Sequence, residues 1–294
     1  MTRALGSLVL VVVLHAVVLG TSWLLSGGLL WAGWPLLFLT AVGIMAAQWL
    51  VFIPSAILQT EKVYDLTGGL TYVLSTVGVL LATWVLDEMH LRSIIMGSFV
   101  VVWAVRLSGF LFLRIHRAGK DGRFDNIKRN PMAFLVAWSL QGTWVFFAAL
   151  PVFVVMSSSQ YQPLGPWVLL GAALWGIGFA IEVTADRQKS AFNTKPENVG
   201  RWIDVGLWRF SQHPNYFGEI VLWTGVLVSG LGVYQGLQWF VCLSPLLITI
   251  LLTRVSGIPM LDARAIEKWG EEKQYLAYRR NTSVLIPWFR KRDD

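Results

Sequence analysis

Residues 211–219, Ser-Gln-His-Pro-Asn-Tyr-Phe-Gly-Glu, join a polar connection to the apolar stretch 220–231. Proline is tolerated in the first turn of a helix, so we expect Pro214 to begin a helix that carries Asn215 and Glu219 on one face. A carboxylate at the start of a hydrophobic span must be paired, hydrogen-bonded or next to a wet cavity, because an unpaired charge in hydrocarbon costs at least about 2.5 kcal/mol. The stretch therefore predicts a polar site at one end of a transmembrane helix.

Composition places the chain in a membrane. Of its 294 residues, 55% are hydrophobic and only 14% are charged, and the mean hydropathy is +0.58. Spans of about 20 residues each then use most of the length. We predict an all-α polytopic integral membrane protein with about seven or eight transmembrane helices and a cytoplasmic loop cap, built as a single membrane domain over residues 1–294.

Apolar runs locate the expected spans. They cover residues 5–25, 29–52, 70–86, 94–113, 133–156, 165–181, 216–231 and 237–252. The first run lacks a convincing small-residue cleavage site, so we interpret it as a retained span and not a signal peptide. Helix-compatible sequence continues past the sixth span through Glu182 and Asp186, and a tight turn at Gly230-Leu231-Gly232 is expected between the last two spans.

Lysine and arginine predict the orientation. They gather in the loop 114–130, in the connection 187–209 and in the tail from Arg254, whereas the opposite connection 157–163 has none. The three basic segments fall on one side, which we expect to be cytoplasmic together with both termini, in a membrane such as a bacterial inner membrane. The same pattern accounts for the formal charge of +7, so nucleic acid is not an indicated partner.

The basic segments also carry hydrogen-bonding side chains. Glu182, Asp186 and Lys189 are spaced i, i+4, i+7 and form one polar stripe on a helix. Cations that converge from separate loops suit a phosphate-bearing ligand, because guanidinium groups bind phosphate bidentately. Individually these cations could instead fix topology or contact lipid head groups, and Tyr275 and Tyr278 could be interfacial aromatics.

Other chemistries have little support. The chain has no HExxH, no GxSxG and a single cysteine, Cys242, so no metal site is predicted. Gly122, Gly200 and Gly206 do not form a GxGxxG pattern after a strand. The polar groups gather on one side without following several spans, which argues against a channel, and no internal repeat favours a transporter. These exclusions favour an enzyme whose site opens to the cytoplasm.

The stretch 211–219 is preceded by Glu182-Val-Thr-Ala-Asp186-Arg-Gln-Lys189 and followed by a tail from Tyr275-Leu-Ala-Tyr278 to Pro287-Trp-Phe. Together these segments resemble the DUF1295 branch of the steroid 5α-reductase superfamily over about residues 59–290. The resemblance implies a helical membrane enzyme whose cytoplasmic loops and last helices enclose NADPH. It divides the chain into N-terminal helices, 1–56, and a reductase-like core, 57–294, and implies that a hydrophobic enone enters from the lipid.

The resemblance also assigns roles. Arg201, Asn215 and Glu219 match cofactor-contacting positions of the steroid enzymes, and Asp186 matches the acid at the cytoplasmic end of the corresponding helix. Arg123 resembles the arginine that holds the adenosine phosphate end, Arg254 resembles the arginine near the end of the last span, and Glu182 stands where those enzymes have asparagine. With the polar residues already described, the candidate cofactor-binding set is Lys120, Arg123, Glu182, Asp186, Lys189, Arg201, His213, Asn215, Glu219, Arg254, Tyr275 and Tyr278. The related methyltransferases and sterol reductases share a His-Pro-x-Tyr-x-Gly motif, which His213 and Pro214 resemble.

The acid that would stabilise the carbonyl is expected near the entrance of the third span. Gln59-Thr60-Glu61 matches the Gln-Glu pair of the steroid enzymes loosely, with one inserted residue, and their tyrosine aligns near Trp103. The candidate catalytic residues are Glu61, Tyr64 and Asp65, with Tyr64 as a possible donor oriented by an acid. The alternative is that these three residues have no catalytic role and form a hydrated loop that caps the following helix.

Three functions are consistent with these patterns. The first is NADPH-dependent reduction of the C=C bond of a lipophilic enone such as a 3-oxo-Δ4 steroid. The second is methyl transfer from S-adenosylmethionine, as in isoprenylcysteine methyltransferases, which needs fewer phosphate-binding cations. The third is a non-catalytic lipid-binding membrane protein. In each case membrane lipid is a partner, and no obligate protein partner is indicated.

Overall fold

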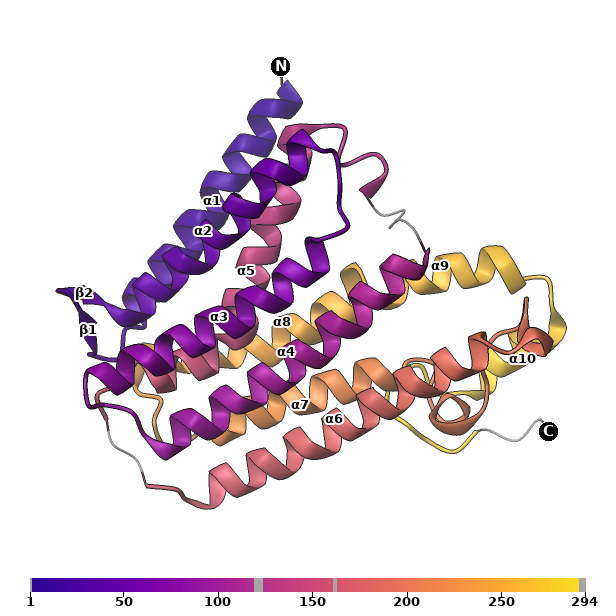
Figure 1. The fold of residues 1–294 in the computed structure, drawn as a ribbon. Coiled ribbons are helices and arrows are strands. Elements are labelled where there is room, and N and C mark those ends of the chain that lie inside the picture. Colours follow the sequence, from indigo (N-terminus) through magenta and orange to yellow (C-terminus); the bar gives the residue numbers. More distant parts are fainter. Residues whose placement is uncertain (1, 119–123, 161–162, 291–294) are drawn as a thin grey trace. The chain divides into compact units, whose positions relative to one another are not determined.

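A computed structural model describes residues 2–118, 124–160 and 163–290, and most of them lie in helices (Figure 1). The long helices are α1 (Thr2–Leu24), α2 (Leu36–Ile57), α3 (Tyr64–Val85), α4 (Leu91–Ala118), α5 (Pro131–Met156), α6 (Pro166–Asn193) and α7 (Pro214–Ser229). The C-terminal part has α8 (Leu243–Ile250), α9 (Ile258–Trp269) and α10 (Lys273–Asn281). Shorter elements are the 3-10 turns η2 (Pro196–Asn198), η3 (Gly206–Arg209) and η4 (Gly236–Cys242), the π-turn η5 (Leu251–Val255), and strands β1 (Leu30–Trp31) and β2 (Trp34–Pro35).

Length and hydropathy confirm the polytopic all-α prediction. Among the described residues, seven helical stretches are long and apolar enough to cross a membrane. They correspond to α1 through α6 and to the interrupted stretch Gly236–Trp269. Helix α7 is only 16 residues long, about 24 Å at 1.5 Å per residue, and is therefore shorter than the roughly 30 Å hydrocarbon layer.

Three boundaries differ from the sequence prediction. Helix α3 begins at Tyr64 and not at residue 70. Its polar first turns remain helical because the hydroxyls of Thr67 and Thr71 donate hydrogen bonds to carbonyl oxygens one turn back, at 2.8 and 2.7 Å. The second span begins at Leu36, since residues 30–35 form a short antiparallel hairpin whose turn has positive φ at Ala32 and Gly33.

The last predicted span, 237–252, is not one continuous helix. It runs through the turn η4, α8 and the π-turn η5 before α9 begins at Ile258. Pro259 lies in the first turn of α9, where proline is tolerated, and a side chain at Gly257 would meet the backbone of Leu252. The chain is therefore irregular between α8 and α9.

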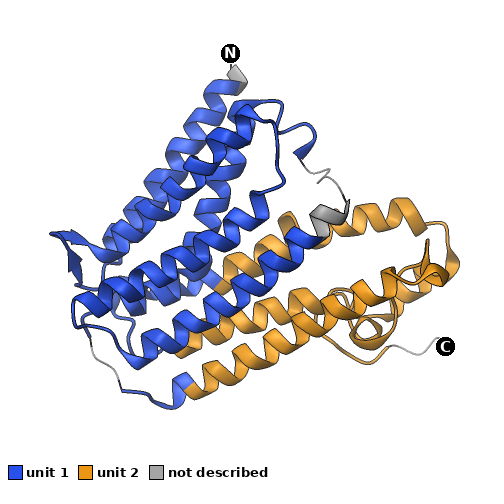
Figure 2. Cartoon of the chain, in the orientation of Figure 1, with its two compact units in different colours: residues 1–168, 230–244 blue, residues 169–229, 245–294 orange. Residues whose placement is uncertain are grey.

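The described chain forms two compact units (Figure 2). Unit 1 comprises Met1–Val168 and Gly230–Ser244, and unit 2 comprises Leu169–Ser229 and Pro245–Asp294. In unit 1, α5 is the central helix, since α1, α2 and α3 all pack on it and Trp138, Phe146 and Phe153 are fully buried. The proposed division at residue 57 stays a prediction.

In unit 2, α6 and α7 run antiparallel and touch through their backbones. A Cβ atom at Gly178 would lie 2.5 Å from the carbonyl oxygen of Gly218, and one at Gly171 would lie 2.5 Å from that of Gly225. Both pairs are seven residues apart on their helices, so the glycines form one stripe on each. Small residues permit such close packing in membranes. The contact fixes the register between the C-terminal half of α6 and the start of α7.

Candidate functional site

The glycine contact brings the predicted acids of α6 next to the first turn of α7. Glu182 and Asp186 are buried, with 2% and 8% of their surface exposed. The amide Nδ2 of Asn215 donates to Oδ1 of Asp186 at 3.3 Å, and Gly218 lies against the backbone of Glu182. Glu219 follows on the same helix and is partly buried. These four predicted residues therefore form one polar cluster, the α6–α7 cluster.

A separate cavity of about 510 Å³ lies between the end of α6, the connection 198–213, α9 and α10 in unit 2. Its lining is rich in cations and aromatic rings. The cations are Lys189, Arg201, Arg264 and Lys268, and the rings are Trp202, Trp208, Trp269, Tyr275 and Tyr278. We call this the cationic cavity.

Aromatic contacts build one wall of the cationic cavity. The ring centroids of Trp202 and Trp269 lie 5.2 and 5.6 Å from that of Tyr275. The Nζ atom of Lys189 lies 4.6 Å from the Trp208 ring centroid, a cation–π contact. The hydroxyl of Tyr278 donates to the Trp208 carbonyl at 3.0 Å. Burial raises the pKa of both Tyr275 and Tyr278, so both phenols stay neutral at physiological pH.

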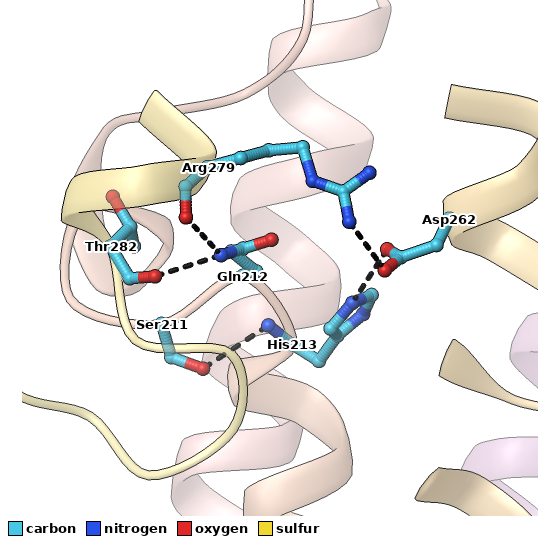
Figure 3. A network of polar contacts seen from close by, with 6 residues as sticks. All are labelled: Ser211, Gln212, His213, Asp262, Arg279 and Thr282. Carbon is cyan, nitrogen blue, oxygen red and sulfur yellow. Dashed lines mark hydrogen bonds and ion pairs between the residues drawn. The ribbon is translucent and has the colours of Figure 1, made fainter. Parts of the chain in front are cut away.

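The polar edge of the cavity is formed by His213 and Asp262, and Arg279 pairs with Asp262 from outside the lining (Figure 3). Nε2 of His213 lies 3.5 Å from Oδ1 of Asp262, whose Oδ2 accepts from Nη2 of Arg279 at 2.8 Å. Burial lowers the pKa of His213 to about 4, more than the nearby Asp262 carboxylate raises it. The imidazole is therefore neutral near pH 7, and the carboxylate is compensated by the guanidinium.

The connection before α7 is tied to the tail, which explains how α10 reaches the cavity. Nε2 of Gln212 donates to the carbonyls of Arg279 and Thr282 at 3.0 and 2.7 Å, as Figure 3 shows. The backbone nitrogen of Gln212 donates to Ser283 at 2.8 Å, and Oγ of Ser211 donates to Leu285 at 2.7 Å. The polar residues before Pro214 thus hold the C-terminal segment in place.

The predicted cofactor residues divide into groups. Lys189, Arg201, His213, Tyr275 and Tyr278 line the cationic cavity. Glu182, Asp186, Asn215 and Glu219 form the α6–α7 cluster and are not among the cavity-lining residues. Arg254 is exposed on the π-turn and does not line the cavity either. Lys120 and Arg123 lie outside the described residues.

Sequence reasoning missed the contribution of α9. Asp262, Arg264 and Lys268 line the cavity, as do Trp202, Trp208 and Trp269. One helical face of α9 carries Asp262, Ala265 and Trp269, which have i, i+3, i+7 spacing. This spacing is the signal from which a separate helix could have been predicted within the basic tail.

The three predicted catalytic residues lie in unit 1 and do not share one site. Glu61 is 2% exposed and forms an ion pair with Lys128, with Oε2 2.7 Å from Nζ. The hydroxyl of Tyr64 donates to the carbonyl of Ala137 at 2.8 Å. Asp65 instead lines a cavity of about 150 Å³ between α3, α4 and α5. Glu61 and Tyr64 thus contact Lys128 and Ala137, and Asp65 lines a cavity.

The Asp65 cavity contains a further tyrosine that the sequence analysis did not single out. Tyr72 lies seven residues after Asp65, on the same face of α3, and its ring packs edge-on against Trp103 with centroids 5.3 Å apart. Oε1 of Gln141 is buried there and accepts no hydrogen bond from the residues that the structure describes. A group with a polar hydrogen-bonding end would fit this space.

Comparisons with known proteins give the family. No solved structure matches the chain. An uncharacterized protein of Schizosaccharomyces pombe is 22% identical over 166 residues, which cover 47% of this chain and 48% of the relative. The chain thus spans about half the length of that curated protein. A family model described as a protein of unknown function, DUF1295, matches residues 51–282. The matched range includes the Asp65 cavity, the cationic cavity and the α6–α7 cluster. The chain therefore belongs to the DUF1295 family.

Proposed function

We propose that the protein is a membrane-embedded, NADPH-dependent reductase of the C=C bond of a lipophilic enone, with a 3-oxo-Δ4 steroid as the leading substrate class. The observation that carries the proposal is the cationic cavity, in which four cationic side chains and five aromatic rings line a space of about 510 Å³. Family membership is compatible with the proposal and does not specify an activity.

The residues of the cavity fit a phosphate-bearing ligand with planar rings. Arg201 and Arg264 can bind phosphate bidentately, and Lys268 adds a point charge. Aromatic faces stack on nucleobases, each contact contributing about 1–3 kcal/mol. Nε1 of Trp202 is buried and donates no hydrogen bond within the described residues, so a donor remains for the ligand.

The charge balance favours an anion. Asp262 is the one acid among the described residues of the lining, and Arg279 already compensates it. S-adenosylmethionine carries a sulfonium, an ammonium and only one carboxylate, and no phosphate, so it would offer the cations of this cavity far less negative charge than a dinucleotide phosphate. The cavity therefore supports a dinucleotide over the methyl donor.

Reduction also requires an acid for the carbonyl oxygen of the enone. A bound nicotinamide nucleotide supplies the hydride that adds to the β-carbon. The chain must then stabilise negative charge on the oxygen and deliver a proton to the α-carbon. Because Asp65 and Tyr72 line one cavity together with the buried Oε1 of Gln141, we assign this role to Asp65, with Tyr72 as the donor to the carbonyl.

We further propose that the cationic cavity faces the cytoplasm, with both termini on that side. Its cations come from segments that the positive-inside rule places there, and NADPH is a cytoplasmic cofactor. A bacterial inner membrane is the membrane we propose.

Cofactor binding tests the proposal directly. We would measure the thermal unfolding midpoint of the detergent-solubilised protein with NADPH, NADH or S-adenosylmethionine. NADPH should raise the midpoint, and Arg201→Ala or Arg264→Ala should remove this rise without changing the midpoint of the apoprotein. Arg187→Ala is the matched control, since Arg187 is exposed on α6 and does not line the cavity.

Other outcomes separate the alternatives. Stabilisation by S-adenosylmethionine alone would contradict the reductase proposal and favour a methyltransferase. NADPH binding with no reduction of any cyclic enone would favour the non-catalytic lipid-binding protein. Asn215→Ala distinguishes the two polar sites of unit 2: unchanged NADPH binding in this variant would assign the α6–α7 cluster to structure.

A further inference from the structure

The C-terminal segment 283–290 is fixed to the protein by its backbone. Ser283 and Leu285 accept from Gln212 and Ser211, as described above, and the backbone nitrogen of Trp288 donates to the carbonyl of Phe210 at 3.0 Å. Nε of Arg290 donates to the carbonyl of Arg209 at 3.1 Å. Side chains on this segment are therefore held in defined positions.

The fixed segment nevertheless exposes large apolar side chains. Ile286, Trp288 and Phe289 are 61%, 70% and 77% exposed, and Val284 is half exposed. A large apolar patch that is held in place marks a surface that contacts another protein or a membrane.

The position of the segment in unit 2 favours the membrane. Its partner Ser211 lies three residues before the start of α7 at Pro214, and the continuous apolar part of α7 begins at Ile220. From Pro214 to Ile220 the helix rises about 9 Å. The interfacial layer is roughly 5–8 Å thick on each side of the hydrocarbon, so a hydrocarbon boundary at Ile220 places the segment at the outer edge of the lipid head groups. Tryptophan beside arginine is typical of that level.

A groove of about 470 Å³ joins this patch to the end of α10. One part of its lining is polar, with Arg279, Arg280 and Thr282, and the other part is apolar, with Ile286, Trp288 and Phe289. Thr282 is 3% exposed, and its Oγ1 makes no hydrogen bond within the described residues; the same holds for Nη1 of Arg279. The groove thus offers buried polar atoms and a cation next to a hydrocarbon surface.

We infer that this groove binds an anionic phospholipid of the surrounding bilayer. The phosphate lies against Arg280 and the Thr282 hydroxyl, and the acyl chains cover Ile286, Trp288 and Phe289. Because α10 also carries Tyr275 and Tyr278 of the cationic cavity, the bound lipid holds one wall of that cavity at the membrane surface. The inference is independent of which cofactor the cavity takes.

Native mass spectrometry of the delipidated full chain tests the inference. The protein would be titrated with phosphatidylglycerol or phosphatidylcholine of the same acyl composition. We expect preferential retention of phosphatidylglycerol. One arginine contributes about 1 kcal/mol near an anionic surface, so Arg280→Gln should weaken this binding about fivefold. Trp288→Ser should weaken the binding of both lipids, because it removes a contact with their acyl chains.

Matched variants keep the result interpretable. The control variants are Arg187→Gln and Trp167→Ser, which change exposed residues outside the groove. Both variant proteins should bind the two lipids as the unmodified chain does. If Arg280→Gln does not fold, Thr282→Val serves in its place, since it removes the hydroxyl at constant size. Equal binding of the two lipids, or an unchanged preference in Arg280→Gln and Thr282→Val, would overturn the inference. Full displacement of the lipid by inorganic phosphate would also overturn it, because the groove would then recognise a free anion.

Discussion

His213 and Asp262 lie 3.5 Å apart between Nε2 and Oδ1, yet the carboxylate is held more closely by Arg279, at 2.8 Å. The guanidinium therefore supplies the compensating charge, and the buried imidazole remains neutral with a pKa lowered to about 4. This arrangement keeps one edge of the cationic cavity uncharged at neutral pH. It also makes stability depend on pH.

The first prediction follows from the lowered pKa of His213. Below pH 6.5 the unfolded chain takes up a proton on this residue, but the folded chain does not until pH approaches 4. The free energy of unfolding should therefore fall as pH decreases from about 6.5 to 4, and this contribution should level off below 4. Thermal unfolding midpoints of the detergent-solubilised protein across this range would measure it. His213→Gln should flatten the decrease, and an identical slope in this variant would contradict the assignment.

The second prediction concerns the contact between α6 and α7. In Gly178→Ala the new methyl group would lie 2.5 Å from a backbone oxygen, so the helices must separate and stability should fall by about 1–3 kcal/mol. Gly176→Ala is the matched control, since a Cβ atom there meets nothing within 4 Å. Unfolding midpoints of the two variants would be compared. If both alanines behave alike, the backbone contact does not hold the helices together.

A third prediction concerns the buried ion pair of Glu61 and Lys128. Removing one partner leaves a charge without compensation, which typically costs 3–5 kcal/mol when both groups are fully buried. Because the Lys128 side chain is 21% exposed, Lys128→Met should cost less than this range, yet more than Lys62→Met at an exposed site. Combining Lys128→Met with Glu61→Gln should recover part of the loss. A double variant as unstable as the sum of the single ones would show that the pair does not interact.

The fourth prediction separates the tyrosines of α3. If the Asp65 cavity stabilises the enone oxygen, Tyr72→Phe should lower kcat by about 10²–10⁴-fold while NADPH still stabilises the protein. Tyr64→Phe should mainly reduce stability, since it breaks the bond to Ala137. Turnover of a cyclic enone and thermal stabilisation by NADPH would be measured for both. A full rate in Tyr72→Phe would exclude it as the donor, whatever the cofactor result.

Much of the fold could be predicted from local patterns. Apolar runs indicated the spans, Pro214 begins α7 as expected, and α6 continues past residue 181 to Asn193. The start of α3 was wrong because Thr67 and Thr71 satisfy their hydroxyls within the helix, which a polarity count cannot detect. The break between α8 and α9 lies at Gly257, whose backbone packs against that of Leu252, a contact that the local sequence does not reveal.

The sites were less predictable, because they depend on tertiary contacts. Asp186 and Asn215 are 29 residues apart, and they meet because the glycine contacts set the register of α6 and α7. The partner of Glu61, Lys128, is 67 residues away, and no local pattern joins them. Likewise, Asp262 became recognisable only when α9 was seen to form a wall beside His213.

The glycine contact has a consequence for motion within unit 2. Where two helices touch through their backbones, no side chains lie between them whose rotamers could change, so α6 and α7 move as one body. Any opening of the cationic cavity must then come from the elements on its other side. The π-turn Leu251–Val255 and Gly257, which connect α8 to α9, are where backbone torsions can change. Glycine on α6 and α7 thus confines flexibility to the C-terminal helices.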